Sequence, residues 1–327
     1  MRKAALIYNP ASGSQHALRV QMVESAAAVL RAEGIEASLF ATRDANSGGE
    51  QAREAIADGH DAIFACGGDG TVQDVLQGMV GTHADVPLGL VPLGTGNVLA
   101  FDLGIPNDPA AAVRAQLTFV PRKIAAGRVD YRRKNDGSEH SRFFTVMAGV
   151  GADAEMIYRV SSLSKGRFGI WAYHLETLRT ALLHPYQRMQ VEYVESESGE
   201  RKSVEAFAVA AVRVTTFPGM MGKFAPGAEL VRDDLRIVLT LTTNRVWHAA
   251  YFMRVLTGIS GPVPGIELAH ANEITCTPVI AEARKIYVEA DGEFLGGLPV
   301  KIRAVPAAFT LLMRKRSALS GQHSVTT

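Results

Sequence analysis

The chain has 327 residues, enough for about two domains with sizeable hydrophobic cores. Its 34 Lys and Arg residues balance 33 Asp and Glu residues, and the net charge of +1 excludes a general electrostatic attraction to nucleic acid. Only Cys66 and Cys276 are present, which excludes a disulfide framework and fits a reducing compartment. No uncharged apolar run reaches the roughly 18 residues that a membrane span requires, so we expect any membrane contact to be made at the surface.

Residues 1–120 alternate between short apolar runs and segments with helical spacing of apolar side chains. The runs that predict strands are 4–8, 39–41, 62–65 and 88–91. The segments that predict helices are 20–30, 50–57 and 72–79, the first two ended by Gly34 and Gly59. This alternation is typical of a parallel sheet covered on both faces, in which ligands bind at the carboxyl ends of the strands.

From about residue 125 the pattern changes to runs typical of antiparallel strands. The turn sequence Asn135-Asp136-Gly137 predicts a hairpin. The runs that predict strands are 129–133, 143–147, 190–194, 204–214, 237–241 and 286–289. Two helices are predicted in this part, over 170–183 and 246–256. The predicted fold class is therefore α/β, with a parallel N-terminal domain followed by a β-rich antiparallel domain.

Two glycine-rich loops follow predicted strands at the edge where ligands are expected. They read Cys66-Gly67-Gly68-Asp69-Gly70-Thr71 and Pro92-Leu93-Gly94-Thr95-Gly96-Asn97. Because glycine has no Cβ, backbone N–H groups of such a loop can surround phosphate oxygens, and the following helix adds its N-terminal N–H groups. One such loop is common in α/β proteins, but two of them predict a nucleotide phosphate held between neighbouring strands.

Two further features of the first domain have both a structural and a functional interpretation. Asn9-Pro10-Ala11-Ser12-Gly13 ends the first predicted strand and either binds phosphate or forms a turn in which Ser12 or Ser14 caps the next helix. Asp69 stands among amides that are expected to bind phosphate, which it would repel unless a magnesium ion lies between them. The alternative is that Asp69 caps the following helix.

Asp291 is the main candidate for acid–base chemistry. It follows the predicted strand 286–289 and precedes Gly292. Asp-Gly is a common hairpin turn, which is the structural interpretation. The functional interpretation is that the carboxylate accepts a proton from a substrate hydroxyl near the phosphates.

Other charged residues of the second domain are weaker candidates. Asp233 and Asp234 form a carboxylate pair that could hold magnesium. Asp153 and Glu155 follow another glycine-rich loop and are candidates for substrate contact. The basic stretch 122–134 is either a solvated face or a contact for anionic lipid headgroups.

Taken in order, these motifs resemble the diacylglycerol kinase catalytic family, which includes sphingosine kinases and soluble bacterial lipid kinases. The residues that carry the resemblance are Asn9 to Gly13, Gly67 to Thr71, Pro92 to Asn97 and Asp291 to Glu293. The loop Gly67 to Thr71 is shared with NAD kinases, so the four motifs in order are what is specific. The resemblance covers nearly the whole chain and implies a nucleotide-binding α/β domain, a β-rich domain and ATP in the cleft between them.

The resemblance also assigns roles to individual residues. The positions that match ATP contacts are Asn9, Pro10, Ala11, Ser12, Gly13, Thr42, Gly67, Gly68, Asp69, Gly70, Thr71, Val72, Gln73, Asp74, Gly94, Thr95, Gly96 and Asn97. Asp291 matches the general base and Glu293 a supporting carboxylate, and Asp69 is expected to act with them near the phosphates.

The chain departs from the family pattern in three places. Val98 stands where the bacterial enzymes have Asp, a loss that resembles sphingosine-type kinases. Asp74 and Gln77 stand where an acid and an Asn are usual. The magnesium segment, normally Asp-Asp-Gly, reads Arg232-Asp233-Asp234-Leu235. These departures leave the magnesium network and the acceptor open.

The sequence therefore predicts an ATP-dependent lipid kinase that uses Mg²⁺ and phosphorylates a diacylglycerol-like or sphingoid lipid. The alternatives are an NAD kinase-like enzyme and a catalytically impaired nucleotide- or lipid-binding protein. The expected parts are a nucleotide-binding domain over 1–125 completed by 300–316, a lipid-binding domain over 126–299, and a disordered tail over 317–327. We expect a cytoplasmic protein of lipid metabolism that meets its lipid at the membrane surface and binds no nucleic acid. The oligomeric state, a dimer included, is left open.

Overall fold

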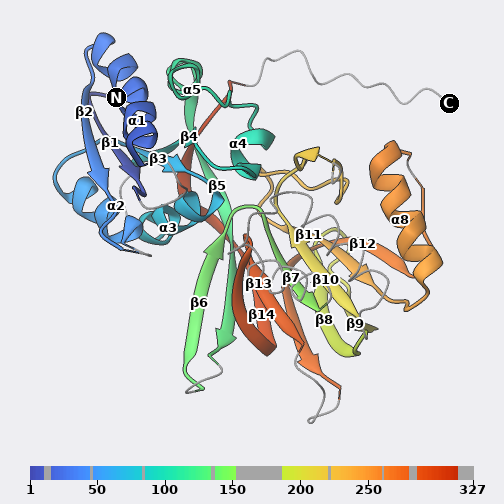
Figure 1. The fold of residues 1–327 in the computed structure, drawn as a ribbon. Helices are drawn as coiled ribbons and strands as arrows, with labels where there is room; N and C mark the ends of the chain where they lie inside the picture. The colour runs from blue at the N-terminus through green and yellow to red at the C-terminus, as the bar shows by residue number, and fades with distance from the viewer. Residues whose placement is uncertain are drawn as a thin grey trace. The chain divides into compact units, whose positions relative to one another are not determined.

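The fold is taken from a computed structural model, in which two compact units are formed by Met1–Lys123 with Phe309–Thr327 and by Ile124–Ala308 (Figure 1). The structure describes residues 1–10, 16–44, 47–82, 85–133, 137–151, 186–219, 222–259, 261–279 and 286–315. The predicted helix over 170–183, the turn residues Asn135 and Asp136, and the predicted tail lie outside these ranges.

The first unit is built on a parallel sheet in the order β2-β1-β3-β4-β14. Its strands are β1 (Lys3–Tyr8), β2 (Glu36–Ala41), β3 (Ala62–Gly67), β4 (Pro87–Pro92) and the end of β14 (Glu293–Met313). The last of these joins through Thr310 and Leu311, which pair with Pro87 and Leu88. A strand from the far end of the chain therefore completes the N-terminal sheet.

Helices cover both faces of this sheet. They are α1 (His16–Ala32), α2 (Gly48–Ala57), α3 (Asp69–Met79), α4 (Val98–Asp102) and α5 (Pro109–Gln116). Alternate side chains of a strand point to opposite faces, and Leu6 and Ile7 are both fully buried, so each face has its own cover. Leu6 packs in a cluster with Leu30 of α1 and Val113 of α5. The apolar strands predicted from the sequence thus form the expected parallel sheet.

The second unit is β-rich and antiparallel. Its strands are β5 (Val120–Arg132), β6 (Glu139–Phe144), β7 (Met147–Gly151), β8 (Met189–Glu195), β9 (Arg201–Ala206), β10 (Ala208–Val212), β11 (Leu235–Thr240), β12 (Ile266–Pro278), β13 (Tyr287–Ala290) and the first part of β14. The pairing runs β14-β13-β7-β10-β11-β12, and β12 pairs with β14 again. The helix α8 (Arg245–Thr257) connects β11 to β12.

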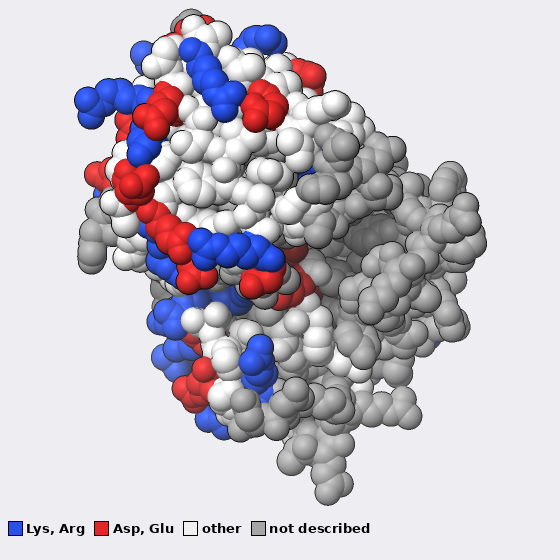
Figure 2. All heavy atoms as spheres, turned by 60° about the vertical axis from the view of Figure 1, so that its left-hand side comes forward, with Lys and Arg blue, Asp and Glu red and all other residues white. Residues whose placement is uncertain are grey.

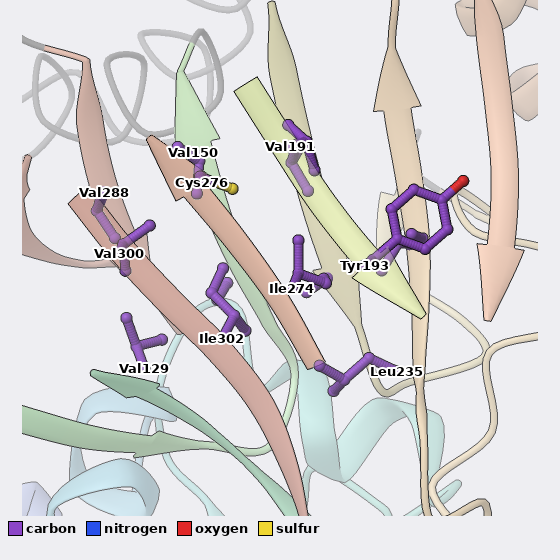
Figure 3. Close-up of a cluster of buried hydrophobic side chains, with 14 of the residues drawn as sticks. Val129, Val150, Val191, Tyr193, Leu235, Ile274, Cys276, Val288, Val300 and Ile302 are labelled. Carbon is purple, nitrogen blue, oxygen red and sulfur yellow. The ribbon is translucent and has the colours of Figure 1, made fainter. Parts of the chain in front are cut away.

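The core of the second unit lies among these strands. Figure 3 shows side chains from several of them gathered into one apolar cluster. The labelled members are Val129, Val150, Val191, Tyr193, Leu235, Ile274, Cys276, Val288, Val300 and Ile302. Both cysteines, Cys66 and Cys276, are free and buried.

Two predicted strands are each split in the structure, which corrects the prediction. The run 143–147 is divided between β6 and β7 by a bend at Thr145 and Val146. The run 204–214 is divided between β9 and β10 at Phe207, because β9 pairs with β8 whereas β10 pairs with β7 and β11. A continuous apolar run cannot reveal that a chain changes its pairing partner partway along.

Candidate active site

Three strand ends of the first unit lie together at one edge of the sheet. Tyr8 at the end of β1 pairs with Cys66 of β3, and Gly67 at the end of β3 pairs with Pro92 at the end of β4. The residues that follow these ends are Asn9 and Pro10, the first glycine loop, and the second glycine loop. The motifs assigned to phosphate binding therefore share the carboxyl edge of a parallel sheet, where ligands of α/β proteins bind.

The two glycine loops pack against each other through their backbones. The Leu93 N–H donates to the Gly67 carbonyl at 2.9 Å. A Cβ placed on Gly94 would lie 2.5 Å from the Gly68 Cα, closer than side chains tolerate. Gly70 differs, since a Cβ there would meet no other described atom within 4 Å. Glycine is thus required at Gly94 for loop contact, while Gly70 faces open space.

Asn97 holds the second loop in shape. Its Oδ1 accepts from the Gly94 N–H at 3.0 Å, and its Nδ2 donates to the Gly94 carbonyl at 2.8 Å. Asn97 itself has a left-handed backbone with φ of +47°, a conformation that asparagine adopts more readily than most residues. The exposed residues Gly94, Thr95 and Gly96 form the tip of this loop.

Asp69 links the first loop to the second. Its Oδ1 accepts from the Val98 N–H at 2.7 Å, at the start of α4. Burial raises the pKa of the Asp69 carboxyl, and backbone N–H groups of Asn97, Val98 and Leu99 oppose this shift. The carboxylate therefore caps α4, a helix 29 residues further on, rather than a helix that follows its own loop directly. This contact couples the position of Val98 to Asp69.

Other residues assigned to ATP contact have structural partners in the first unit. The Asp74 Oδ2 accepts from the Gly48 N–H at 2.8 Å, at the start of α2. The Thr42 N–H donates to the Tyr8 carbonyl at 2.8 Å, which extends the pairing of β1 and β2 by one residue. Gln73 is buried. Ala11, Ser12 and Gly13 lie outside the described residues.

Asp291 lies in the turn between β13 and β14 of the second unit, with φ of +46°. Its Oδ1 accepts from the N–H groups of Val146 at 2.9 Å and Met147 at 3.0 Å. Its Oδ2 accepts from the Thr145 N–H at 2.8 Å and the Thr145 hydroxyl at 3.3 Å. The bend that separates β6 from β7 is therefore formed around this carboxylate, which fixes Asp291 in a single orientation.

Neighbouring acids of the same turn are also engaged. Glu293 forms an ion pair with Arg142 of β6. Glu289 is completely buried, and its Oε2 accepts from the Gly292 N–H at 3.0 Å. Arg142 and the three amides at 145–147 carry no motif, so no signal in the sequence identified them as partners of the Asp291 turn.

Asp234 does not have the surroundings of a metal ligand. Its Oδ1 and Oδ2 accept from Arg232, each at 2.7 Å, and its Oδ1 lies 3.3 Å from His270 Nδ1. Despite burial, the pKa of Asp234 is lowered, chiefly by the hydrogen bond from Arg232. Buried Arg213 donates to the Asp234 and Arg232 carbonyls at 2.6 and 2.8 Å, which fixes this segment.

A magnesium site built from Asp233 and Asp234 therefore does not fit the structure. Asp233 is exposed, and Asp234 already has its charge compensated by Arg232. In the part of the chain that the structure describes, no group of three or more His, Cys, Asp or Glu side chains could hold a metal ion. Asp153 and Glu155 lie outside this part.

The basic stretch is partly neutralised by acids. Lys123 pairs with Asp85 at 2.7 Å, and Arg128 pairs with Asp130 at the same distance. Arg132 pairs with Glu139 at 3.2 Å. On the face shown in Figure 2, basic and acidic side chains are likewise interspersed. No described helix has both the length and the apolar character needed to cross a bilayer.

Comparison with known proteins shows which families match the chain. Residues 3–129 match the family described as diacylglycerol kinase catalytic domain, and residues 145–313 match the YegS C-terminal NAD kinase beta sandwich-like domain. A diacylglycerol kinase of Mycobacterium tuberculosis is 28% identical over 312 residues, with 95% of this chain and 94% of the relative covered. A diacylglycerol kinase of Bacillus subtilis is 29% identical over 309 residues, with 91% and 92% covered.

A solved structure shares the fold. The crystal structure of a diacylglycerol kinase from Bacillus anthracis superposes with a TM-score of 0.67 at 19% identity, and covers 95% of this chain and 97% of that one. Both domain families match in the same order as the two units described above, and together they span most of the sequence. The chain therefore belongs to the diacylglycerol kinase catalytic domain family, a family of lipid kinases.

Proposed function

We propose that the protein transfers the γ-phosphoryl group of ATP to the hydroxyl of a lipid. The observation that carries this proposal is the pair of glycine loops, which meet at Gly68 and Gly94 on the carboxyl edge of a parallel sheet. A helix of 11 residues, α3, begins at Asp69 directly after the first loop. Its first N–H groups and its dipole would bind the phosphates together with the loop amides.

The loops would act mainly by positioning the triphosphate. Catalysis of phosphoryl transfer depends on alignment and on stabilisation of charge, with little covalent chemistry for the protein to perform. The hydrogen bond from Val98 to Asp69 holds the start of α4 against the first loop, and Asn97 fixes the tip of the second. Both contacts would keep the loop amides in place before ATP arrives.

Magnesium supplies positive charge to the phosphates when it is bound with ATP. Asp69 places a carboxylate at the glycine loops, and its Oδ1 already accepts a hydrogen bond from the Val98 N–H. Because Asp233 and Asp234 do not fit a metal site, we propose no protein ligand set for the ion.

Asp291 would accept the proton of the lipid hydroxyl as that oxygen attacks the γ-phosphorus. Three backbone amides and a hydroxyl hold its carboxylate in one orientation, which is the positioning that a general base requires. The same contacts support the competing interpretation, in which Asp291 only stabilises the bend at 145–147. A substitution must separate the two roles.

The proposed acceptor is diacylglycerol, since that is the substrate named for the relatives in Mycobacterium tuberculosis and Bacillus subtilis. A sphingoid base is the second candidate, because Val98 replaces the aspartate that the bacterial enzymes have at this position. Asp69 also contacts position 98, but it accepts from the backbone N–H of Val98, which every residue except proline supplies.

The test is transfer of ³²P from γ-labelled ATP to a panel of acceptors in mixed micelles. The panel contains diacylglycerol, monoacylglycerol, sphingosine, ceramide, phosphatidylglycerol and, without micelles, NAD. We expect labelled phosphatidic acid as the main product. Labelled NADP would favour the NAD kinase interpretation, and ATP binding with no labelled product from any acceptor would favour a binding protein.

A further inference from the structure

The helix α8 presents an apolar face to solvent. Val246 is 67% exposed, Met253 54% and Leu256 39%. Their spacings of seven and three residues place these side chains on one side of the helix. The buried residues of α8 are Tyr251 and Val255, which lie on the other side. The helix is therefore apolar on the side that faces solvent as well as on the side that packs against the protein.

This apolar face is concentrated rather than scattered. Trp247, 37% exposed, follows Val246 in the first turn, and Ile259, 68% exposed, follows the glycine that ends the helix. Eleven large hydrophobic side chains are exposed among the described residues, and five of them belong to this region: Val246, Trp247, Met253, Leu256 and Ile259. We call these five residues the α8 face. Contiguous exposed apolar side chains of this kind mark interaction sites, whereas single ones are ordinary.

The orientation of α8 is fixed by specific contacts. The Asn244 side chain caps its first turn by accepting from the Val246 N–H, and Gly258 ends it in a left-handed conformation. On the buried side, the Tyr251 hydroxyl donates to the Phe224 carbonyl, and His248 Nε2 lies 2.9 Å from the Thr242 carbonyl. Figure 1 shows the helix at the outer edge of the second unit. Its apolar side therefore faces outward in the folded protein.

The charge of α8 indicates what covers this face. The helix contains Arg245 and Arg254 and no acidic residue. Arg245 is exposed at the first turn, and Arg254 lies over the Tyr251 ring at 4.7 Å and donates to the Gly261 carbonyl. An exposed arginine beside exposed apolar side chains can contact the phosphates of anionic headgroups while the apolar side chains enter the boundary with the acyl chains.

We propose that the α8 face docks the protein onto the surface of a bilayer that contains anionic lipids. Val246, Met253 and Leu256 enter the boundary between headgroups and acyl chains, and Arg245 contacts the headgroup phosphates. The choice of a lipid surface rests on the proposed function, because a kinase of a membrane lipid must reach that lipid where it resides. The ion-paired stretch 122–134 is the less suitable surface, since it offers no apolar side chains in a comparable group.

The test is sedimentation of the protein with sucrose-loaded vesicles of phosphatidylcholine and phosphatidylglycerol, without ATP. The double variant Val246→Gln with Met253→Gln removes apolar area from the face and keeps good helix formers. The matched control is Val194→Gln with Val279→Gln, at positions that are 41% and 45% exposed outside α8. We expect the α8 variant to bind at least about tenfold more weakly than wild type, and the control to bind as wild type does.

A third variant, Arg245→Gln, tests the electrostatic part. We expect it to bind more weakly at low salt and to lose part of the salt dependence that wild type shows on anionic vesicles. Circular dichroism and thermal shift with ATP confirm that each variant is folded and binds nucleotide. Equal binding by wild type and the α8 variant would overturn the proposal.

Three other outcomes are distinguishable. If sedimentation velocity shows that the wild type is a dimer and the α8 variant a monomer, a second copy covers the α8 face and the proposal is wrong. If wild type phosphorylates lipid in detergent micelles but does not bind vesicles, the docking proposal fails while the proposed function stands. Vesicle binding by a protein that transfers no phosphate would sustain docking and refute the function.

Discussion

Replacement of Asp291 by asparagine separates the catalytic from the structural interpretation of the turn. Asparagine keeps one carbonyl oxygen, but its NH₂ group takes the place of the other oxygen and donates instead of accepting. The less costly orientation puts NH₂ where Oδ2 lies, opposite the Thr145 N–H and hydroxyl. The hydroxyl can rotate to accept, so one buried backbone N–H loses its partner.

The cost can be worked from these contacts. A hydrogen bond to a charged group contributes about 1.5–3 kcal/mol, and the bonds from Val146 and Met147 also weaken when the carboxylate charge is removed. We expect Asp291→Asn to lower the free energy of unfolding by about 2–4 kcal/mol. For a unit of this size that corresponds to a Tm lower by about 5–15 °C. If Asp291 is also the base, kcat falls by about 10²–10⁴-fold.

The assay is turnover of labelled ATP with diacylglycerol micelles, at a temperature where circular dichroism shows the variant fully folded. Thr145→Val is the matched control, because it removes the hydroxyl contact to the carboxylate and keeps the base. We expect this control to retain activity within a few-fold. Turnover near the wild-type rate in folded Asp291→Asn would refute the general base and leave only the bend at 145–147.

Three further substitutions test other contacts. Asp69→Ala removes the cap of α4 and should lower the free energy of unfolding by about 0.5–2 kcal/mol. We also expect ATP to bind at least tenfold more weakly in a titration. An unchanged ATP affinity would show that the loops do not need the hydrogen bond between Asp69 and Val98. Gly94→Val places a side chain against Gly68, so ATP should no longer raise the Tm of the folded variant, and a wild-type shift would contradict loop contact. Burial and nearby Arg236 lower the pKa of His270, so the unfolded chain takes up a proton at this residue more readily than the folded protein does. The stability should therefore fall as the pH decreases from 7 through the ordinary histidine pKa of about 6.5. In His270→Asn that part of the slope in urea unfolding should disappear, and an unchanged slope would assign it to other groups.

Much of the first unit could be predicted because its signals are local. The strand 62–65 appears as β3 with two additional residues at its C-terminal end, the strand 88–91 appears as β4 with one additional residue at each end, and the glycine loops follow them. The helix predicted over 246–256 is α8. Each of these follows from apolar spacing and turn residues within a few positions, which is the range over which the sequence carries such information.

The contacts of the site could not be predicted because they join residues far apart in the chain. Asp69 could be recognised as a helix cap, but nothing nearby shows that it caps α4. Asp291 could be placed in a turn, yet its amide partners at 145–147 lie about 145 residues away. The pairing of Asp234 with Arg232 is local but competes with an equally simple metal interpretation. Only the tertiary structure decides between such alternatives.

The final strand of the N-terminal sheet has a consequence for biosynthesis. Until Leu311 leaves the ribosome, the edge of β4 has no partner on that side, because Thr310 and Leu311 supply the pairing. The residues between β4 and Leu311 require on the order of tens of seconds to translate at the usual rates of synthesis. During that time the nascent chain carries an apolar sheet with an open edge, the feature that chaperones cover and that drives aggregation. Truncations that remove only the part of β14 from Phe309 onward should therefore destabilise the first unit before the second, although these residues are far from β4 in the sequence.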